Sequence, residues 1–533
     1  MFGKLLKLHI VVLGLVAASL AYAQQSKNQQ GALPELIAID ADTAATPNGA
    51  LLLDRQQQFR NSLSSGETED ALESAKQIVS LASMIWGEKS EQVASSLTNL
   101  AITQTDNGNF DAARENFVVA IKILEEANNS IIDAGLINPI RGLADASMAL
   151  DNAEQAVPLY ERAIHVSHVN DGPNNLGQIQ DMDALSRAYF ALGELRDANK
   201  VQENMFRLQR RQFDKDSDQY IDAVVRRARW YTEVRSPDRA RIAYTRAIQS
   251  ISRIHGDTDK RLIQPLIELA FIPPTGFNDE DNVDQAAINN ARKQAISRAV
   301  RIARLHATDD PALLAQTLVK KGDFHTSDGQ GRLARLPYKQ AWEITTTTPG
   351  LESLHKQLFS EPKAVRLEPI RATWKRLRGR AGTQSGVFQN DRGFVEVGFT
   401  VSPFGRPIAL YVIDSQPAGL MDRKVLSGLR SFKYRPAFRD GNAVQTQGLT
   451  FRHDFRYSEE RLTPKERERI AKVEAMRNGR EESSDEPETA ESPLEPDLQE
   501  DVALDAAESA RAAPDDGDDV GLVTQNSDDD NPE

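Results

Sequence analysis

Few residues in this sequence have types and spacings that could do chemistry. His165 and His168 lie three residues apart in a helical stretch, a spacing that can bind a metal ion from one helix face. No carboxylate is adjacent to them, so ordinary histidines on a helix surface are the favoured interpretation. Asp279, Asp281 and Asp284 resemble a calcium loop, but the required glycine and terminal glutamate are missing. We interpret them as a solvated acidic loop.

Other catalytic and nucleotide-binding patterns are also missing from the sequence. It contains no P-loop and no GxGxxG motif. Gly329-Gln-Gly331 is a lone glycine pair in a loop and lacks the rest of either motif. It contains no cysteine, so disulfides and thiolate metal sites are excluded. No arrangement of serine, histidine and aspartate can be inferred from spacing. We therefore predict a protein that is not an enzyme and that needs no cofactor or metal.

Composition and charge indicate the elements that must position any binding residues. At 533 residues the chain exceeds one ordinary core, so roughly two to four domains are expected. Apolar residues make up 40% of the chain and aromatic residues only 6%, which favours helices packed through alanine and leucine. The net charge of −14 arises from residues 481–533, which carry 20 acids and one base and are expected to be disordered.

The basic charge is concentrated just before this acidic tail. Residues 363–456 contain 17 Lys and Arg against 7 Asp and Glu. Such a split favours solubility, or a contact between the tail and the basic segment, over binding of nucleic acid. We therefore expect no nucleic-acid partner and a tail-to-module self-contact.

The N-terminus has the pattern of an export signal. Lys4 and Lys7 precede an apolar run over residues 8–20, and Ala21-Tyr-Ala23 closes it. The run is shorter than the roughly 20 residues of a comfortable membrane span. We predict cleavage after Ala23 and a periplasmic mature protein. The alternative is an uncleaved anchor in the inner membrane, and only then would the chain contact a membrane.

Residues 55–345 have helical periodicity, broken at short intervals by glycine, asparagine or aspartate. Small alanines recur in this region with spacings of 42, 43, 42 and 42 residues, at Ala71, Ala113, Ala156, Ala198 and Ala240. Aromatic residues follow several of them four residues later. A small residue lets two helices approach and the aromatic ring fills the space beside the crossing. This pattern predicts stacked helix pairs.

The repeat resembles the tetratricopeptide repeat in its longer variant, as in kinesin light chain. The usual unit is roughly 34 residues, so the longer period implies longer helices. The match is good over residues 55–250 and degrades after Ile272, which leaves the number of pairs beyond five open. The resemblance implies a groove that binds protein or peptide partners. Its candidate lining residues are Asn99, Arg187, Arg226 and Arg229, and the alternative is that the arginines are solvated or salt-bridged.

From Gly393 the pattern changes to alternating strands. The expected order is a strand at 394–401, a strand at 408–414, a helix at 420–431 and a last strand at 444–455. This segment resembles the C-terminal domain of the TonB family. The residues that carry the resemblance are Gly393, Val395, Val397, Phe399, Gly405, Ser415, Pro417, Asp422, Leu426, Leu429, Tyr434, Arg435, Pro436, Ala437, Asp440, Gly441 and Phe451.

In the TonB family the final strand is an exposed edge that pairs with a short peptide of outer-membrane transporters. The resemblance therefore implies an extended peptide partner, with outer-membrane transporters among the candidates. The alternative is that residues 363–380 or the acidic tail cover this edge. The candidate peptide-binding residues are Tyr434, Arg435, Pro436, Gln445, Thr446, Gln447, Thr450 and Arg452.

The sequence thus predicts a mainly α protein in which a helical solenoid precedes a small α+β domain and a disordered acidic tail. Its predicted segments are a signal peptide (1–23), a linker (24–54), the repeat domain (55–345), a basic connection (346–389), the TonB-like domain (390–457), a charged helix (458–480) and the tail (481–533). The function favoured is a non-enzymatic periplasmic adaptor. The alternatives are a TonB-type energy transducer with an uncleaved anchor and a purely structural envelope protein.

Overall fold

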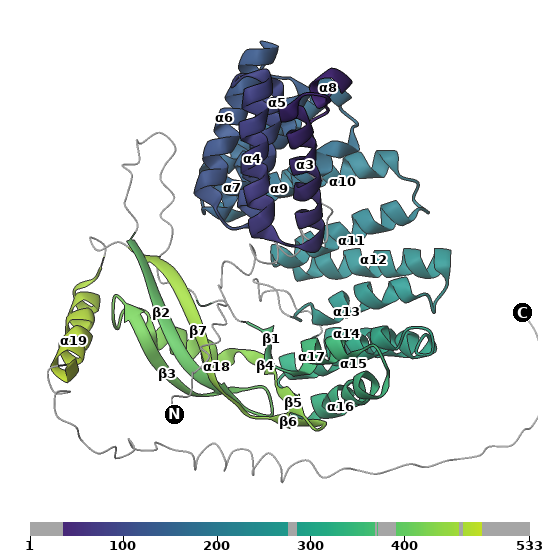
Figure 1. Ribbon diagram of the computed structural model, residues 1–533. Coiled ribbons are helices and arrows are strands. Elements are labelled where there is room, and N and C mark those ends of the chain that lie inside the picture. Colours follow the sequence, from purple (N-terminus) through teal and green to yellow (C-terminus); the bar gives the residue numbers. More distant parts are fainter. Residues whose placement is uncertain (1–35, 275–284, 368–369, 371–390, 458–461, 482–533) are drawn as a thin grey trace, which may run out of the picture. The chain divides into compact units, whose positions relative to one another are not determined.

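A computed structural model describes residues 36–274, 285–367, 370, 391–457 and 462–481 (Figure 1). The predicted signal peptide, the acidic loop at Asp279 to Asp284 and nearly all of the acidic tail lie outside these residues. The described residues up to Ile470 belong to one compact unit, and a second unit begins at Ala471. None of the described helices is long and apolar enough to cross a membrane.

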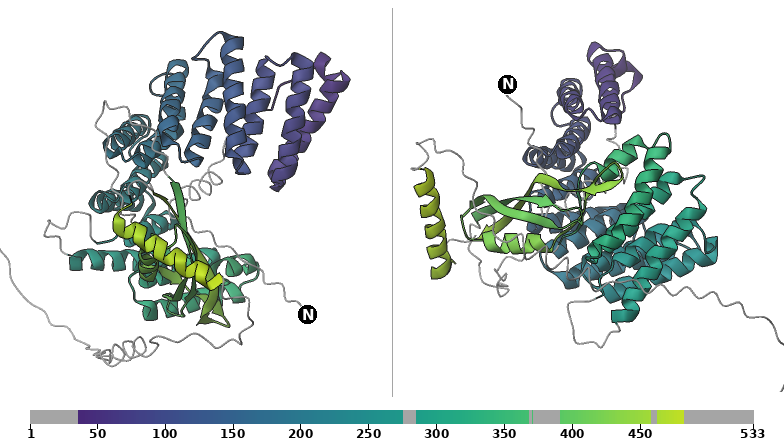
Figure 2. Two further views of the ribbon diagram at one scale, coloured as in Figure 1. Left: turned by 90° about the vertical axis from the view of Figure 1, so that its left-hand side faces the viewer. Right: turned by 90° about the horizontal axis from the view of Figure 1, so that it is seen from below.

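Helices pack in consecutive pairs through most of the described chain (Figures 1 and 2). A short helix, α2 (Ala41–Ala44), precedes the array, and 3-10 turns at Ala134–Leu136, Leu176–Gln178 and Lys260–Leu262 precede α7, α9 and α13. The paired helices are α3 (Pro47–Ser65) with α4 (Thr68–Trp86), α5 (Glu91–Asp106) with α6 (Phe110–Asn128), α7 (Ile137–Ala149) with α8 (Ala153–Asp171), α9 (Ile179–Ala191) with α10 (Leu195–Gln212), α11 (Asp218–Glu233) with α12 (Pro237–His255), α13 (Ile263–Phe271) with α14 (Gln285–Leu305), and α15 (Pro311–Ser327) with α16 (Gly331–Thr347).

The alanine period predicted the contacts between these helices. All five periodic alanines lie on the second helix of their pairs, and each is fully buried. The aromatic residue four positions later is also buried in the pairs that have one, as at Phe117, Tyr160 and Tyr244. In the fourth pair Gln202 takes this place, and its amide donates to Ser186 Oγ at 2.7 Å. The expectation of a helical solenoid is confirmed.

The array begins earlier than the sequence indicated, so part of the predicted linker 24–54 is helical. Thr46 caps α3 by accepting a hydrogen bond from the Gly49 N–H, and Pro47 occupies the first helical position, where a missing N–H costs nothing. Leu52 and Phe59 are then buried against α4. Helix α3 is therefore part of the hydrophobic core of the array, whereas a polar linker would have remained exposed.

The predicted connection at 346–389 also contains ordered elements. Helix α17 (Glu352–Phe359) packs on α16, and strand β1 (Lys363–Arg366) follows it. Leu358 and Phe359 are buried, so this segment extends the core of the last helix pair. Its apolar residues are too few and too close together to show a period, which explains why the sequence pattern missed them.

Residues 391–457 form the TonB-like module. Its main sheet has the order β3-β2-β7 with antiparallel neighbours, and helix α18 packs against it. Val395, Val397, Leu429 and Phe451 belong to its core. The predicted order of two strands, a helix and a strand is confirmed, with three short strands added. The elements are β2 (Asp391–Val401), β3 (Pro407–Gln416), α18 (Asp422–Ser431), β4 (Lys433–Arg435), β5 (Ala437–Arg439), β6 (Asn442–Val444) and β7 (Thr446–Tyr457), after which comes α19 (Pro464–Glu481).

Candidate peptide-binding surfaces

Strand β7 lies at one edge of the main sheet. It pairs with β2 along nearly its whole length, from Val401 opposite Thr446 to Asp391 opposite Tyr457. No strand among the described residues pairs with the other side of β7. An unpaired edge presents a row of N–H and C=O groups that can accept an extended chain.

The described part of the basic connection does not cover this edge. Strand β1 pairs with β4, and the Ile370 side chain lies against Gly428 of α18, where an added Cβ would be 2.6 Å from Ile370 Cγ1. Neither contact involves β7. The rest of the connection lies outside the described residues.

Five of the predicted peptide-binding residues lie along β7 or at its start. Gln445 and Gln447 are exposed, whereas Thr446, Thr450 and Arg452 are half-buried. The Arg452 guanidinium lies 3.8 Å from the centre of the Phe394 ring. It also pairs with Asp454 at 3.1 Å. The structure thus brings these five residues together on one strand.

The other predicted residues, Tyr434, Arg435 and Pro436, lie elsewhere in the module. Tyr434 is buried in the module core, where its ring centre is 5.5 Å from that of Phe399. Burial raises the pKa of its hydroxyl above the ordinary range. Its backbone N–H donates to the Gly405 carbonyl at 2.8 Å. These contacts give Tyr434 a packing role within the module.

Arg435 is buried against the last helix pair of the array. Its Nε donates to Asp323 Oδ1 at 2.9 Å and its Nη2 donates to Asp323 Oδ2 at 2.8 Å. Its Nη1 donates to the Leu358 carbonyl at 3.0 Å, and Tyr338 Oη donates to Asp323 Oδ1 at 2.9 Å. Burial disfavours the charged guanidinium, but the charge and hydrogen bonds of Asp323 outweigh it, and the pKa of Arg435 is raised.

A second set of contacts surrounds this ion pair. Strand β1 pairs with β4 in antiparallel register, with Ala364 opposite Tyr434. The Phe438 ring of β5 packs edge-on against Tyr338 at 5.5 Å and against Phe359 at 5.3 Å between ring centres. The β5–β6 hairpin of the module therefore belongs to the core at the end of the array, which is separate from the module's own core.

The predicted groove residues of the array lie on the first helices of their pairs. Asn99 is buried on α5, and Arg226 is half-buried on α11. Arg187 pairs with Glu233 at 3.4 Å, and Arg229 pairs with Glu268 at 2.9 Å. Both pairs connect neighbouring repeats, so these two arginines are salt-bridged.

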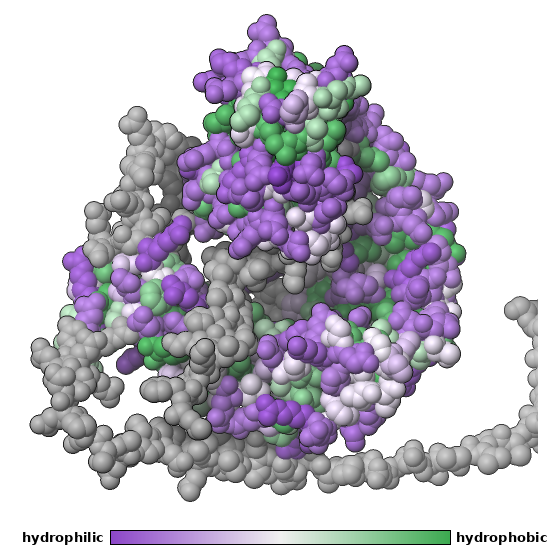
Figure 3. All heavy atoms as spheres, viewed as in Figure 1, coloured by the Kyte–Doolittle hydropathy of each residue, from purple (hydrophilic) through white to green (hydrophobic). Residues whose placement is uncertain are grey.

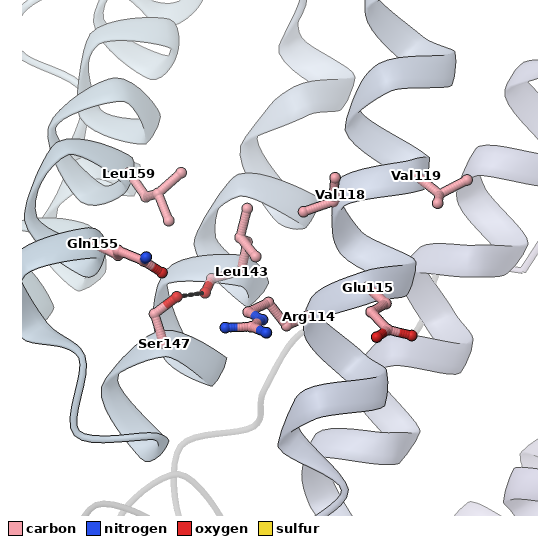
Figure 4. A pocket seen from close by; sticks show the side chains of 8 residues that line it. All are labelled: Arg114, Glu115, Val118, Val119, Leu143, Ser147, Gln155 and Leu159. Atoms are coloured by element: carbon pink, nitrogen blue, oxygen red, sulfur yellow. Dashed lines mark hydrogen bonds between the residues drawn. The ribbon is translucent and has the colours of Figure 1, made fainter. Parts of the chain in front are cut away.

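A pocket of about 530 Å³ lies between α6 and α8, with α7 at its base (Figure 4). Val118 and Leu159 face it from its two sides, and Ser147 lies at its base. Its lining is largely apolar, whereas Figure 3 shows hydrophilic and hydrophobic residues interspersed over the visible described surface. No group of three or more metal-binding side chains occurs among the described residues.

Comparisons with known proteins match one segment of the array and the C-terminal module. Residues 388–457 match the family model of the Gram-negative bacterial TonB protein C-terminal, and residues 93–131 match a tetratricopeptide repeat. Both models describe protein-interaction domains rather than enzymes. No curated protein matches the chain.

Solved structures similar to the chain are repeat proteins. The TPR-like repeats of a kinesin light chain from Podosopora anserina are 18% identical, with a TM-score of 0.36, over 39% of this chain and 98% of that one. BtubC (BKLC) from P. vanneervenii is 17% identical, with a TM-score of 0.34, over 46% of this chain and 90% of that one. A tetratricopeptide repeat protein from Parabacteroides merdae is 14% identical, with a TM-score of 0.33, over 58% of this chain and 98% of that one. The two family models therefore place a tetratricopeptide repeat at residues 93–131 and a C-terminal domain of the TonB family at residues 388–457 of this chain.

Proposed function

We propose that this protein is a non-enzymatic adaptor of the Gram-negative cell envelope. The array binds a protein partner, and the TonB-like module binds an extended peptide by strand addition at β7. The observation that carries the proposal is the outer side of β7, which has no strand partner among the described residues. The exposure of Gln445 and Gln447 on this edge supports it.

The docking of the module on the array also supports an adaptor. Because Arg435 and Phe438 are buried against the array, a partner on β7 and a partner on the repeats would be held at a fixed separation. A freely tethered domain would not fix that separation. The two binding surfaces are therefore best understood as parts of one scaffold.

Introduced cysteines can test the strand addition, since the chain has none of its own. Full-length variants with one cysteine at each of positions 445, 446, 447, 449, 450 and 452, which leave Gly448 and the core residue Phe451 intact, are labelled with a photoactivatable benzophenone and irradiated with solubilised outer membranes. Strand addition predicts crosslinks to one extended partner segment that alternate along β7, because successive side chains point to opposite faces. The same scan over positions 408–413 of β3, the other edge, is the matched control. Equal crosslinking on both edges, or none on β7, would contradict the proposal.

The location and anchoring of the protein need a separate measurement. Sequencing of the mature N-terminus, together with carbonate extraction of the envelope fraction, distinguishes a released periplasmic adaptor from an anchored transducer. A chain that starts at Gln24 and is released by carbonate supports the adaptor. An intact Met1 on a chain that resists extraction supports energy transduction, because force on an outer-membrane partner requires an anchor.

A further inference from the structure

A second groove in the array has a different chemistry from the one in Figure 4. It lies between α10 and α12 over α11, in the same position two repeats later, and its volume is about 260 Å³. We call it the basic groove, and it is defined by Arg196, Lys200, Arg227, Trp230, Tyr231 and Arg239.

Three cations of the basic groove have no carboxylate partner among the described residues. Arg196 and Lys200 are exposed on α10, and Arg239 is exposed at the start of α12. In contrast, Arg227 at the base of the groove pairs at 2.6 Å with Glu203, the one carboxylate in the described lining of the groove. Residues 195–255 contain 14 basic and 8 acidic residues, so the surrounding field is also positive.

The base of the groove is aromatic and held in place. Trp230 is only 3% exposed, and its Nε1 donates to Asn199 Oδ1 at 2.9 Å. The Tyr231 ring is half-buried, with the guanidinium carbons of Arg227 and Arg239 5.4 and 5.9 Å from its centre. Fixed aromatic rings beside arginines are the composition most often found at the energetic centres of protein interfaces.

We propose that the basic groove binds an acidic peptide segment of a partner protein. Its carboxylates would pair with Arg196 and Lys200 on one wall and with Arg239 on the other, while an apolar side chain between them rests on Tyr231. A small anion would pair with the cations but leave the aromatic base unused, which favours a peptide over free phosphate. The inference rests on the proposed function, because it gives the chemistry of the partner that the array binds.

The test uses fluorescence anisotropy with the full-length protein. The probe is a labelled eight-residue peptide that alternates glutamate or aspartate with leucine, and its glutamine and asparagine analogue is the neutral control. Reversal of both Arg196 and Lys200 to glutamate, or Arg239→Glu alone, should weaken probe binding by about tenfold or more, as expected for close charge pairs. Lys215→Glu, beyond the far end of α10, should change binding by less than about twofold because screening removes distant charges.

A further variant should act in the opposite direction. Glu203→Gln removes the carboxylate that neutralises Arg227, so the probe should bind about threefold more tightly. A merely structural role for these charges would not produce tighter binding. Unchanged circular dichroism and melting temperature confirm that each variant is folded.

Several outcomes would overturn the proposal. They are equal binding of the neutral analogue, full competition by inorganic phosphate, or insensitivity to the reversals at Arg196, Lys200 and Arg239. If a chain that ends at Glu481 binds the probe about tenfold more tightly than the full-length protein, the groove is assigned to the protein's own acidic tail instead. Crosslinking at β7 in the same variants shows whether the proposed function fails with the groove or independently of it.

Discussion

The buried pair of Arg435 and Asp323 permits a quantitative prediction about the docking of the module. The change is Asp323→Asn, which keeps the shape of the side chain but leaves the Arg435 guanidinium buried without its counter-charge. Arg435 and Asp323 are 5% and 4% exposed, so solvent cannot replace the lost partner.

The expected loss follows from this burial. Removal of one member of a buried ion pair typically destabilises by about 3–5 kcal/mol, because the remaining charge has no compensation. Tyr338 also loses its charged acceptor, although its hydroxyl still forms a hydrogen bond with Thr326 Oγ1 at 3.0 Å. A loss of this size would raise the population of the undocked module by roughly 150- to 5,000-fold.

Hydrogen exchange measured by mass spectrometry can detect this change locally. Amides of β1 and β4, apart from the Tyr434 N–H that bonds to Gly405 within the module, should exchange faster by about two to nearly four orders of magnitude in Asp323→Asn, because the pairing of β1 with β4 requires the docked module. Amides in the centre of β2 and in α5 should keep their wild-type rates. The ion pair of Arg452 and Asp454, whose side chains are 41% and 43% exposed, is the matched control, and Asp454→Asn should cost less than about 1 kcal/mol.

The double variant Asp323→Leu with Arg435→Met separates charge from packing. Because it leaves no buried charge, it should recover most of the lost protection. Unchanged exchange in β1 and β4 of Asp323→Asn would refute the reasoning. So would a double variant that is as labile as the single one.

Three further predictions concern packing and pH. Gly405→Ala should lower stability by about 2 kcal/mol or more, since Gly405 has φ of +78° and a Cβ there would lie 1.9 Å from the Tyr434 carbonyl oxygen. Gly448→Ala, with a similar φ and open space, should cost only about 1 kcal/mol in the same thermal melts. Gly142→Ala should cost about 1–3 kcal/mol because the new Cβ would lie 2.2 Å from Phe117, and Phe117→Leu should partly restore stability in the double variant. Burial lowers the pKa of His453, so its stabilisation should be full above the unfolded value near 6.5 and be lost as pH falls below it toward the folded value. His453→Gln should therefore reduce the loss of melting temperature between about pH 7 and 5.

Each of these three predictions has a contradicting result. Equal losses in the Gly405 and Gly448 variants would show that the contact with Tyr434 is not the cause. A Phe117→Leu variant that worsens the Gly142→Ala defect would exclude the steric explanation. An unchanged pH dependence in His453→Gln would assign the titration to another group, such as His325, whose pKa burial also lowers.

The array could be predicted from sequence because its packing is local and periodic. Each buried alanine repeats after one helix pair, and the ring four positions later fills the adjoining space, so a few residue types reveal the unit. The last pair carries the same packing, with Ala334 and Tyr338 both buried on α16, but the loop near Pro273 breaks the period. Period alone therefore could not extend the array to its end.

The candidate site was only partly predictable, for a physical reason. The last strand follows from its alternating pattern, which predicted it at 444–455 where the structure has it at 446–457, and its place at the edge was implied by the family resemblance. The partner of Arg435 does not, because Asp323 lies 112 residues away and no pattern in one sequence links them. The prediction that Tyr434, Arg435 and Pro436 bind peptide came from family resemblance, whereas the structure assigns Tyr434 and Arg435 buried packing positions.

The order in which the chain is synthesised gives this buried pair a consequence for folding. Helix α15 emerges before the module, whether from the ribosome or during export, so Asp323 has no ionic partner until Arg435 follows. Repeat arrays need a terminal cap that shields their open end, and here β1, β4 and the β5–β6 hairpin supply it. A chain truncated before the module would expose Phe359 and Tyr338 at that end. The array and its cap are thus expected to mature together, with the last repeat closing only after the module has folded.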